Sequence, residues 1–222
     1  MKLYYMPGAC SLASHIVLEW IGKPYEAHRL SRDELKAPEF LKVNPLGAVP
    51  ALSDGDWTVT QNAAILEYLA EQAPESGLMG DGSARSRADV RRWLGFINSD
   101  VHKTFSMIFG AQRFLAEEGA QKQLAGSASK LLTRLFAQLD AQLAGKSYLT
   151  GDTPTIADAI STWCCAGRTP RKWTCRARTT WPPSSSAWKP TAPCNPPWPP
   201  KAVIGNPRGR SQASPDAAAR PS

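Results

Sequence analysis

The sequence predicts an α/β domain over residues 1–72, a linker over 73–83 and an all-α domain over 84–159. A strand-helix-strand pattern at the N-terminus predicts the first domain, because such a unit favours parallel pairing of its strands. Apolar residues at helical spacing after the linker predict the second domain. The linker is rich in Gly, Pro and Ser, which interrupt regular structure. With 222 residues the chain is long enough to bury a proper core.

The first elements surround a cysteine. Residues 2–5 predict a strand, Pro7-Gly8 a turn, and residues 10–22 a helix. A helix start carries unpaired N–H groups and partial positive charge, which favour a thiolate. We therefore expect Cys10 to be an accessible nucleophile of low pKa, the alternative being a cysteine that serves only packing.

The remainder of the sheet is predicted from residues 25–30, 49–52 and 57–60, with a short helix over 38–43. A hairpin turn, Asp-Gly-Asp, separates the last two strands. A proline begins the third strand, where a central strand tolerates it poorly. We expect either a cis Val49–Pro50 bond at a sheet edge that faces a ligand, or an ordinary edge strand.

Helices dominate from residue 61 onward. Gln61 and Asn62 begin a helix whose N-terminal amides suit a carboxylate. Two long helices are predicted after the linker, one marked by apolar residues between 90 and 109 and one by apolar residues between 131 and 143. Thr155 and Asp158 then form a variant of the capping box. The apolar period is lost directly afterwards, so the helical domain is expected to be truncated at residue 159.

Residues 160–222 form a tail of different composition. They contain ten of the 26 basic and one of the 19 acidic residues, so the tail carries +9 and the rest of the chain −2. Twelve of the 19 prolines also lie there, which together with the missing period predicts an aberrant, disordered segment. Basic residues interleaved with tryptophan also allow nucleic-acid or membrane-surface binding, a less favoured alternative.

The tail is consistent with a shifted reading frame. When residues 160–167 are back-translated with a TCN codon for Ser161 and read one base earlier, the fifth and sixth codons must encode Val and Leu. The second codon then encodes Ile, Leu or Phe, and the fourth Leu, Met or Val. An apolar helix is therefore hidden in the other frame. We hypothesise that the chain from about Ile160 onward is a frameshifted translation of the helical domain.

Several sequence features bear on compartment and metal content. Neither part of the chain shows disulfide or zinc-ligand spacing, so we expect no metal site. No apolar run approaches membrane-spanning length, and the N-terminus lacks a signal pattern. These features predict a cytoplasmic protein with no membrane partner.

Five short motifs occur in one order along the chain: YYMPGACSL at 4–12, NPLGAVPAL at 44–52, QNAAILEYL at 61–69, VHKTF at 101–105 and TIAD at 155–158. Together they resemble the glutathione S-transferases, and most of all the bacterial beta class, which uses cysteine. The resemblance covers about residues 1–159. It implies a thioredoxin-like N-terminal domain, a helical C-terminal domain, a homodimer and glutathione as cosubstrate.

The resemblance also implies a glutathione site. Cys10 and the neighbouring Ser11 would lie at the glutathione sulfur, and the backbone of Val49 would pair with the cysteinyl part in the manner of an added strand. The remaining implied site residues are Pro50 as the cis-proline, Gln61 and Asn62 at the γ-glutamyl end, His102 from the helical domain, and Lys36 at the glycyl carboxylate. Gly95 stands where many relatives have a polar Asn, and His15 is expected to be structural.

Two enzymatic functions follow from this resemblance. The first is a glutathione transferase that adds the glutathione thiol to small electrophiles, with Cys10 at the sulfur. The second is a glutathione-dependent thiol-disulfide oxidoreductase, because a cysteine at the sulfur also permits exchange. A defective product of a frameshifted gene, with little activity, is the third alternative.

Overall fold

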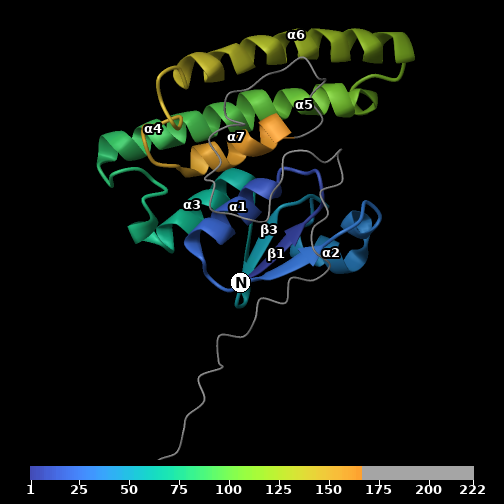
Figure 1. The fold of residues 1–222 in the computed structure, drawn as a ribbon. Helices are drawn as coiled ribbons and strands as arrows, with labels where there is room; N and C mark the ends of the chain where they lie inside the picture. The colour runs from blue at the N-terminus through green and yellow to red at the C-terminus, as the bar shows by residue number, and fades with distance from the viewer. Residues whose placement is uncertain (167–222) are drawn as a thin grey trace, which may run out of the picture. The chain divides into compact units, whose positions relative to one another are not determined.

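The computed structural model describes residues 1–166, with side chains through Cys164. An N-terminal α/β domain is followed by a helical domain, as predicted (Figure 1). The N-terminal domain consists of β1 (Lys2–Tyr5), α1 (Leu12–Ile21), β2 (Glu26–Arg29), the 3₁₀ turn η1 (Glu34–Lys36), α2 (Pro38–Val43), β3 (Ala51–Asp54), β4 (Trp57–Thr60) and α3 (Asn62–Glu71). This is the thioredoxin-like arrangement that the motifs imply.

The four strands form one mixed sheet in the order β2-β1-β3-β4. Strands β1 and β2 are parallel, with Leu3 opposite Ala27, which confirms the pairing predicted from the strand-helix-strand pattern. Strand β3 is antiparallel to both neighbours. It is therefore an interior strand, and the expectation of an edge strand was wrong. Pro50 precedes β3, so the strand loses no ladder hydrogen bond to it, and the Val49–Pro50 bond is cis as predicted.

Helices cover both faces of this sheet (Figure 1). On one face α1 and α3 bury apolar side chains together with Leu3 and Leu52 of the strands. On the other face Phe40 of α2 packs with Leu30 and Ala51 in a smaller cluster. The apolar period of the sequence predicted these buried faces, because residues three and four apart share one side of a helix.

The helical domain begins after a linker that contains the 3₁₀ turn η2 (Pro74–Ser76). Its first long helix is almost continuous: α4 (Ala84–Gly95), the π-helical segment η3 (Phe96–Val101) and α5 (His102–Phe109) follow without a break. After the 3₁₀ turn η4 (Ala111–Arg113), α6 (Glu118–Gln142) runs along α5, as Figure 1 shows. Both long helices predicted from the apolar period are present. A π-helical segment is uncommon and often lies at a functional site.

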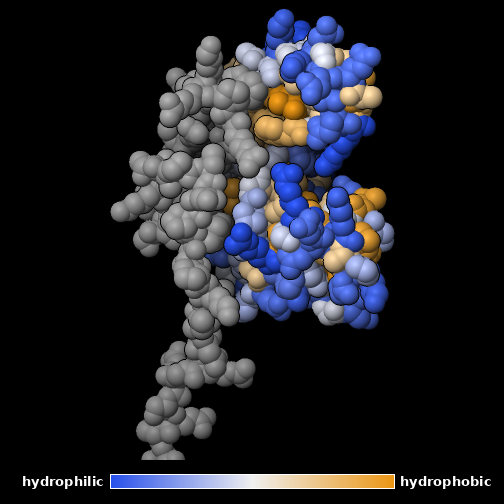
Figure 2. Space-filling model, turned by 90° about the vertical axis from the view of Figure 1, so that its right-hand side faces the viewer, coloured by the Kyte–Doolittle hydropathy of each residue, from blue (hydrophilic) through white to orange (hydrophobic). Residues whose placement is uncertain are grey.

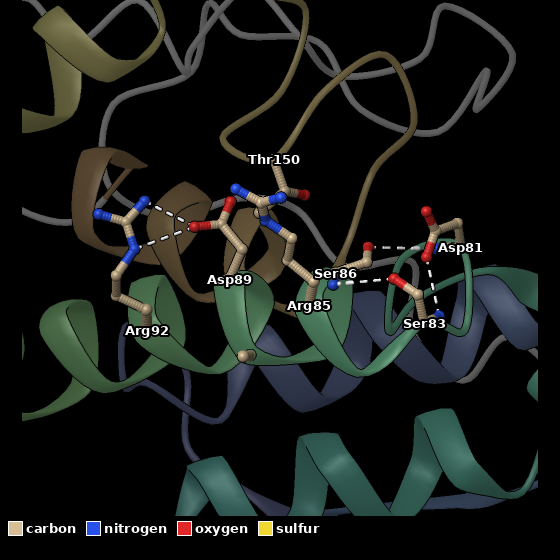
Figure 3. A pocket seen from close by; sticks show the side chains of 8 residues that line it. Asp81, Ser83, Arg85, Ser86, Asp89, Arg92 and Thr150 are labelled. Carbon is tan, nitrogen blue, oxygen red and sulfur yellow. Dashed lines mark hydrogen bonds and ion pairs between the residues drawn. The ribbon is translucent and has the colours of Figure 1, made fainter.

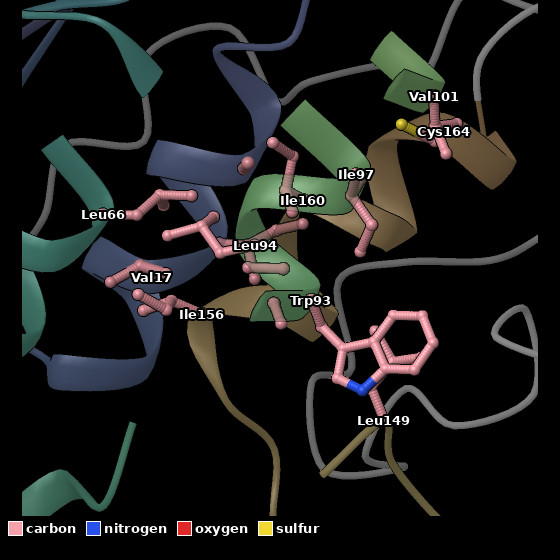
Figure 4. Close-up of a cluster of buried hydrophobic side chains, with 14 of the residues drawn as sticks. Val17, Leu66, Trp93, Leu94, Ile97, Val101, Leu149, Ile156, Ile160 and Cys164 are labelled. Atoms are coloured by element: carbon pink, nitrogen blue, oxygen red, sulfur yellow. The ribbon is translucent and has the colours of Figure 1, made fainter. Parts of the chain in front are cut away.

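The last described element, α7 (Ile156–Ala166), corrects one sequence prediction. We expected the helical pattern to end at residue 159, whereas α7 continues through that boundary. Ile156 and Ile160 are fully buried and Cys164 nearly so, because they recur every four residues on one face (Figure 4). Polar residues between them concealed this period in the sequence. The other predictions for the tail concern residues from 167 onward and lie outside the described residues.

The two domains share one core. Helix α7 packs against both α1 and α4, and Val17, Leu66, Leu94 and Ile160 meet there (Figure 4). The amide of Ile156 also donates a hydrogen bond to the linker carbonyl of Leu78 at 3.1 Å. No helix among residues 1–166 is long and apolar enough to cross a membrane.

Candidate functional site

Cys10 lies at the turn between β1 and α1. The turn is closed by a hydrogen bond from the amide of Ala9 to the carbonyl of Met6, and Gly8 takes a positive φ of 76° within it. Helix α1 begins at Leu12, two residues later than Cys10. The thiol is 9% exposed, and its Sγ donates a hydrogen bond to the carbonyl of Val49 at 3.6 Å. Two predicted site residues, from separate loops, are thus in direct contact.

The electrostatics of Cys10 differ from the sequence prediction. Burial raises the pKa of the thiol to about 11, because the thiolate is deprived of water. The backbone amides of Cys10 and Ser11 face the sulfur and oppose this rise, but their effect is smaller. The prediction of an accessible thiol of low pKa was therefore wrong. Helix-end amides are present as expected, yet desolvation outweighs them in the unliganded protein.

Ser11 supports the turn from inside. Its side chain is fully buried, and its hydroxyl donates to the carbonyl of Met6 and accepts from the amide of Met6, each at 3.3 Å. The hydroxyl is therefore occupied by the turn that holds Cys10. The backbone amide of Ser11, and not its hydroxyl, faces the sulfur of Cys10.

Asn62, the first residue of α3, also points inward. Its Nδ2 donates to the carbonyl of Cys10 at 3.1 Å, and its Oδ1 accepts from the hydroxyl of Ser14 at 3.0 Å. The side chain is 4% exposed, so it ties α3 to the Cys10 turn and does not face outward. A direct side-chain bond from Asn62 to a ligand carboxylate, which the resemblance suggested, is not what this orientation provides. Sequence analysis missed the Asn62–Ser14 pair, which links residues 48 positions apart.

Gln61 has an unusual backbone conformation. It takes a φ of 72°, a positive value that no other non-glycine residue among residues 1–166 has. A side chain other than glycine in such a sparsely populated region costs about 1–3 kcal/mol, and such strain concentrates at functional sites. The residue is exposed and immediately precedes the first amides of α3, which have no acceptor within the helix. The strained position thus lies directly before these amides.

His102 begins α5 directly after the π-helical segment. Its ring meets the indole of Trp163 edge to face, with 4.7 Å between the ring centroids. Burial, followed by the charge of Lys103, lowers the pKa of His102, so the ring is neutral at pH 7. The same indole donates a hydrogen bond from Nε1 to the carbonyl of Gly8 at 3.5 Å. Trp163 therefore connects the predicted histidine with the Cys10 turn, a link that the sequence analysis missed because it assigned Trp163 to the tail.

Three other residues considered in the sequence analysis lie on three separate elements, η1, α4 and α1. Lys36 is exposed at the end of η1. Gly95 ends α4, and a Cβ there would meet no atom within 4 Å. His15 is 4% exposed and packs against Tyr5 and Tyr25, with burial lowering its pKa to about 4. His15 is thus part of the core, as expected.

A polar depression of about 470 Å³ lies elsewhere, along the first turns of α4 (Figure 3). None of the predicted site residues lines it. Within it Arg92 contacts Asp89 at 2.6 Å, Asp81 accepts from the amide of Ser83 at 2.8 Å, and Ser83 caps α4 by accepting from the amide of Ser86. We therefore assign it no part in the site. No cluster of metal-ligating side chains occurs within residues 1–166.

Comparison with known proteins agrees with this geometry. The glutathione S-transferase N-terminal domain profile matches residues 1–71, and the C-terminal domain profile matches residues 98–165. The chain belongs to the glutathione S-transferase family. The C-terminal match ends within α7, which supports the structure over the boundary that we expected at residue 159.

Individual members of this transferase family are similar to this chain over most of their own length. Glutathione S-transferase GST-4.5 of Xanthomonas campestris is 48% identical over 159 residues, which are 72% of this chain and 78% of that protein. The structure of a glutathione S-transferase from Xylella fastidiosa has a TM-score of 0.70 and 44% identity, covering 73% of this chain and 80% of that chain. A beta-class transferase from Sphingomonas chungbukensis has a TM-score of 0.63 and 35% identity, with coverage of 74% and 80%.

Proposed function

We propose that the protein adds the glutathione thiol to small electrophiles, with Cys10 at the glutathione sulfur. The observation that carries this proposal is the contact between the Cys10 thiol and the Val49 carbonyl. It places a sulfur beside a backbone segment, just ahead of β3, that can receive an extended peptide. Glutathione contains such a peptide, and its cysteinyl sulfur would then lie next to Cys10.

The ends of glutathione have separate partners in this proposal. The first amides of α3, presented after the strained Gln61, would bind the γ-glutamyl carboxylate, because helix N-termini favour anions. Asn62 contributes through its backbone and holds α3 on the Cys10 turn with its side chain. Lys36 is exposed and free to extend toward the glycyl carboxylate. Pro50 and Val49 would border the cysteinyl part, with His102 on the side of the helical domain.

The protonation state of Cys10 favours conjugation over exchange. With its pKa raised to about 11, Cys10 is a neutral thiol at pH 7 and can donate a hydrogen bond to a glutathione thiolate. That thiolate then bonds to the electrophilic carbon, and the leaving group departs with its electron pair. The oxidoreductase alternative requires Cys10 itself as the thiolate nucleophile, which its burial disfavours.

The resemblance also supports proposals about assembly and location. We propose a cytoplasmic homodimer with a role in detoxification and with no nucleic-acid partner. Exposed apolar side chains such as Leu46, which is 72% exposed, and Phe114, which is 53% exposed, support a partner surface. Hydrophobic side chains interrupt the otherwise hydrophilic face in Figure 2. Sedimentation of the full chain that yields only the monomer mass would reject the dimer.

The decisive experiment compares two activities in one set of variants. The full chain should be retained on immobilised glutathione, be eluted by free glutathione, and conjugate an aryl halide. Cys10→Ala should lower conjugation and abolish any mixed disulfide with glutathione detected by mass spectrometry. Cys164→Ala, which removes a cysteine of α7, is the matched control and should leave both unchanged. Exchange that exceeds conjugation in the unmodified chain would favour the oxidoreductase instead.

A further inference from the structure

We infer that Trp163 is a specificity-determining residue that selects planar aromatic electrophiles for the reaction at Cys10. The inference rests on the proposed function and extends it to a residue that neither the motifs nor the family's cysteine chemistry assigns. It depends on where α7 directs this side chain, on what holds the indole in place, and on the aromatic residues beside it.

The position of Trp163 on α7 separates it from the core stripe. Ile160 and Cys164 are buried, whereas the side chain of Trp163 is half-buried. Core packing therefore does not account for the whole of this large side chain. One edge of the indole reaches the N-terminal domain, where Nε1 donates to the carbonyl of Gly8, two residues before Cys10.

The orientation of the indole is set by contacts from both domains. His102 meets it at 81° with 4.7 Å between centroids, and Phe105 at 69° with 5.8 Å. These are edge-to-face arrangements, which aromatic rings prefer because of their quadrupoles. With the Gly8 hydrogen bond they hold the indole next to the turn that carries Cys10. A preorganised aromatic surface binds a ligand without the cost of ordering it.

The neighbouring residues identify the kind of electrophile. Phe105 and Phe109 stack with an angle of 4° between their rings, and Phe109 is 53% exposed. Phe105 is 5% exposed and lies between the half-buried indole of Trp163 and the exposed ring of Phe109. The exposed parts of Trp163 and Phe109 offer π surface. An electrophile with a flat, electron-poor ring gains from stacking on it, whereas a small aliphatic electrophile gains little.

The test measures the ratio of activities with two electrophiles. A variant that only folds or binds glutathione less well would lose both activities equally and leave this ratio unchanged. Trp163→Leu removes the aromatic surface, and Trp163→Phe keeps a ring but removes the indole N–H. Trp57→Ala is the matched control, because Trp57 of β4 is 49% exposed and has an edge-to-face neighbour in Tyr68 of α3. For each full-length variant, kcat/KM is measured with 1-chloro-2,4-dinitrobenzene and with a small alkyl iodide. Binding of S-methylglutathione and of S-(2,4-dinitrophenyl)glutathione is measured by calorimetry.

We expect Trp163→Leu to lower the ratio of aromatic to aliphatic kcat/KM roughly three- to tenfold, the effect of one aromatic stacking contact. Affinity for the dinitrophenyl conjugate should fall by the same factor, and affinity for S-methylglutathione should not change. Trp163→Phe should retain most of the ratio, and Trp57→Ala all of it. An unchanged ratio, or equal losses for both electrophiles, would overturn the inference. If the unmodified chain bound S-methylglutathione but conjugated neither electrophile, the proposed function would fail instead.

Discussion

At the scale of single residues, burial affects the pKa of the Cys10 thiol more than the nearby helix start does. Cys10 has the amides that were expected to stabilise its thiolate, yet its pKa is raised because little water reaches the sulfur. The Cys10 thiol is therefore protonated at pH 7 in the unliganded protein. Under the proposed function, the glutathione sulfur and not Cys10 is then the group that must ionise before the reaction.

The reactivity of Cys10 should follow from this pKa. In the native chain without glutathione, its alkylation by iodoacetamide should keep accelerating up to pH 10 and show no plateau near 8.5. At pH 8 the rate should be on the order of a hundredfold lower than for the same residue in urea. Peptide mass spectrometry identifies the modified cysteine. A plateau below pH 9 would show that the helix-end amides dominate after all.

His15 makes a second prediction at this scale. Its pKa is lowered to about 4 by burial, so the folded state resists the proton that the unfolded state accepts near pH 6.5. Stability from this residue is present above pH 6.5 and is lost as the pH falls toward 4. The loss approaches about 3 kcal/mol. Urea unfolding at pH 7 and pH 4.5 should show a smaller acid loss of stability in His15→Leu, with the partly exposed His28→Gln as control.

At the scale of elements, the start of α7 was predicted correctly from the sequence, whereas its extent was not. Its start was identified from the capping pattern, and Asp158 accepts hydrogen bonds from the amides of Thr155 and Leu149, each at 2.9 Å, and from the Thr155 hydroxyl. Its continuation was missed. The Asp158 carboxylate fixes both the start of α7 and the loop before it. The bond to Leu149 was not predictable from the sequence, because the two residues are nine positions apart and belong to no local motif.

Asp158→Ala should therefore destabilise the protein by about 2–3 kcal/mol, because it leaves buried amides without acceptors. Asp158→Asn retains an acceptor oxygen and should cost less. Asp152→Ala, at an exposed position in the same loop, is the control and should change stability by less than about 0.5 kcal/mol. Urea midpoints compare the four proteins. Equal effects of the two alanine substitutions would refute the role given to this cap.

Across the whole molecule, the sequence predicted those features that depend on residues close together in the chain. The strand-helix-strand unit, the parallel pairing of β1 with β2 and both long helices follow from periodicity and turn residues. The contacts that build the site were not predictable in this way. The Asn62–Ser14 pair and the Trp163–Gly8 bond join distant segments, and the burial that sets the pKa of Cys10 is a property of the assembled fold.

Helix α7 is compatible with a shifted reading frame from about Ile160 onward. Helix α7 persists in the present frame because Ile160 and Cys164 supply apolar side chains at the two core positions. The shifted frame would place Val at 164 and Leu, Met or Val at 163, so both frames permit this helix. We expect the coding DNA, read one base earlier after residue 159, to remain open and to encode further apolar periodicity. Early stop codons in that frame would reject the hypothesis.

The packing of α7 on α1 has a consequence for synthesis of the chain. Helix α1 is complete once Ile21 has been made, but part of its apolar face is covered by residues that emerge from the ribosome about 140 positions later. At 5–20 residues per second, that interval lasts roughly 7–30 s. During this time the nascent N-terminal domain exposes the surface around Val17 and is a natural client for chaperones. The docking of α7 onto α1 is then a late step of folding.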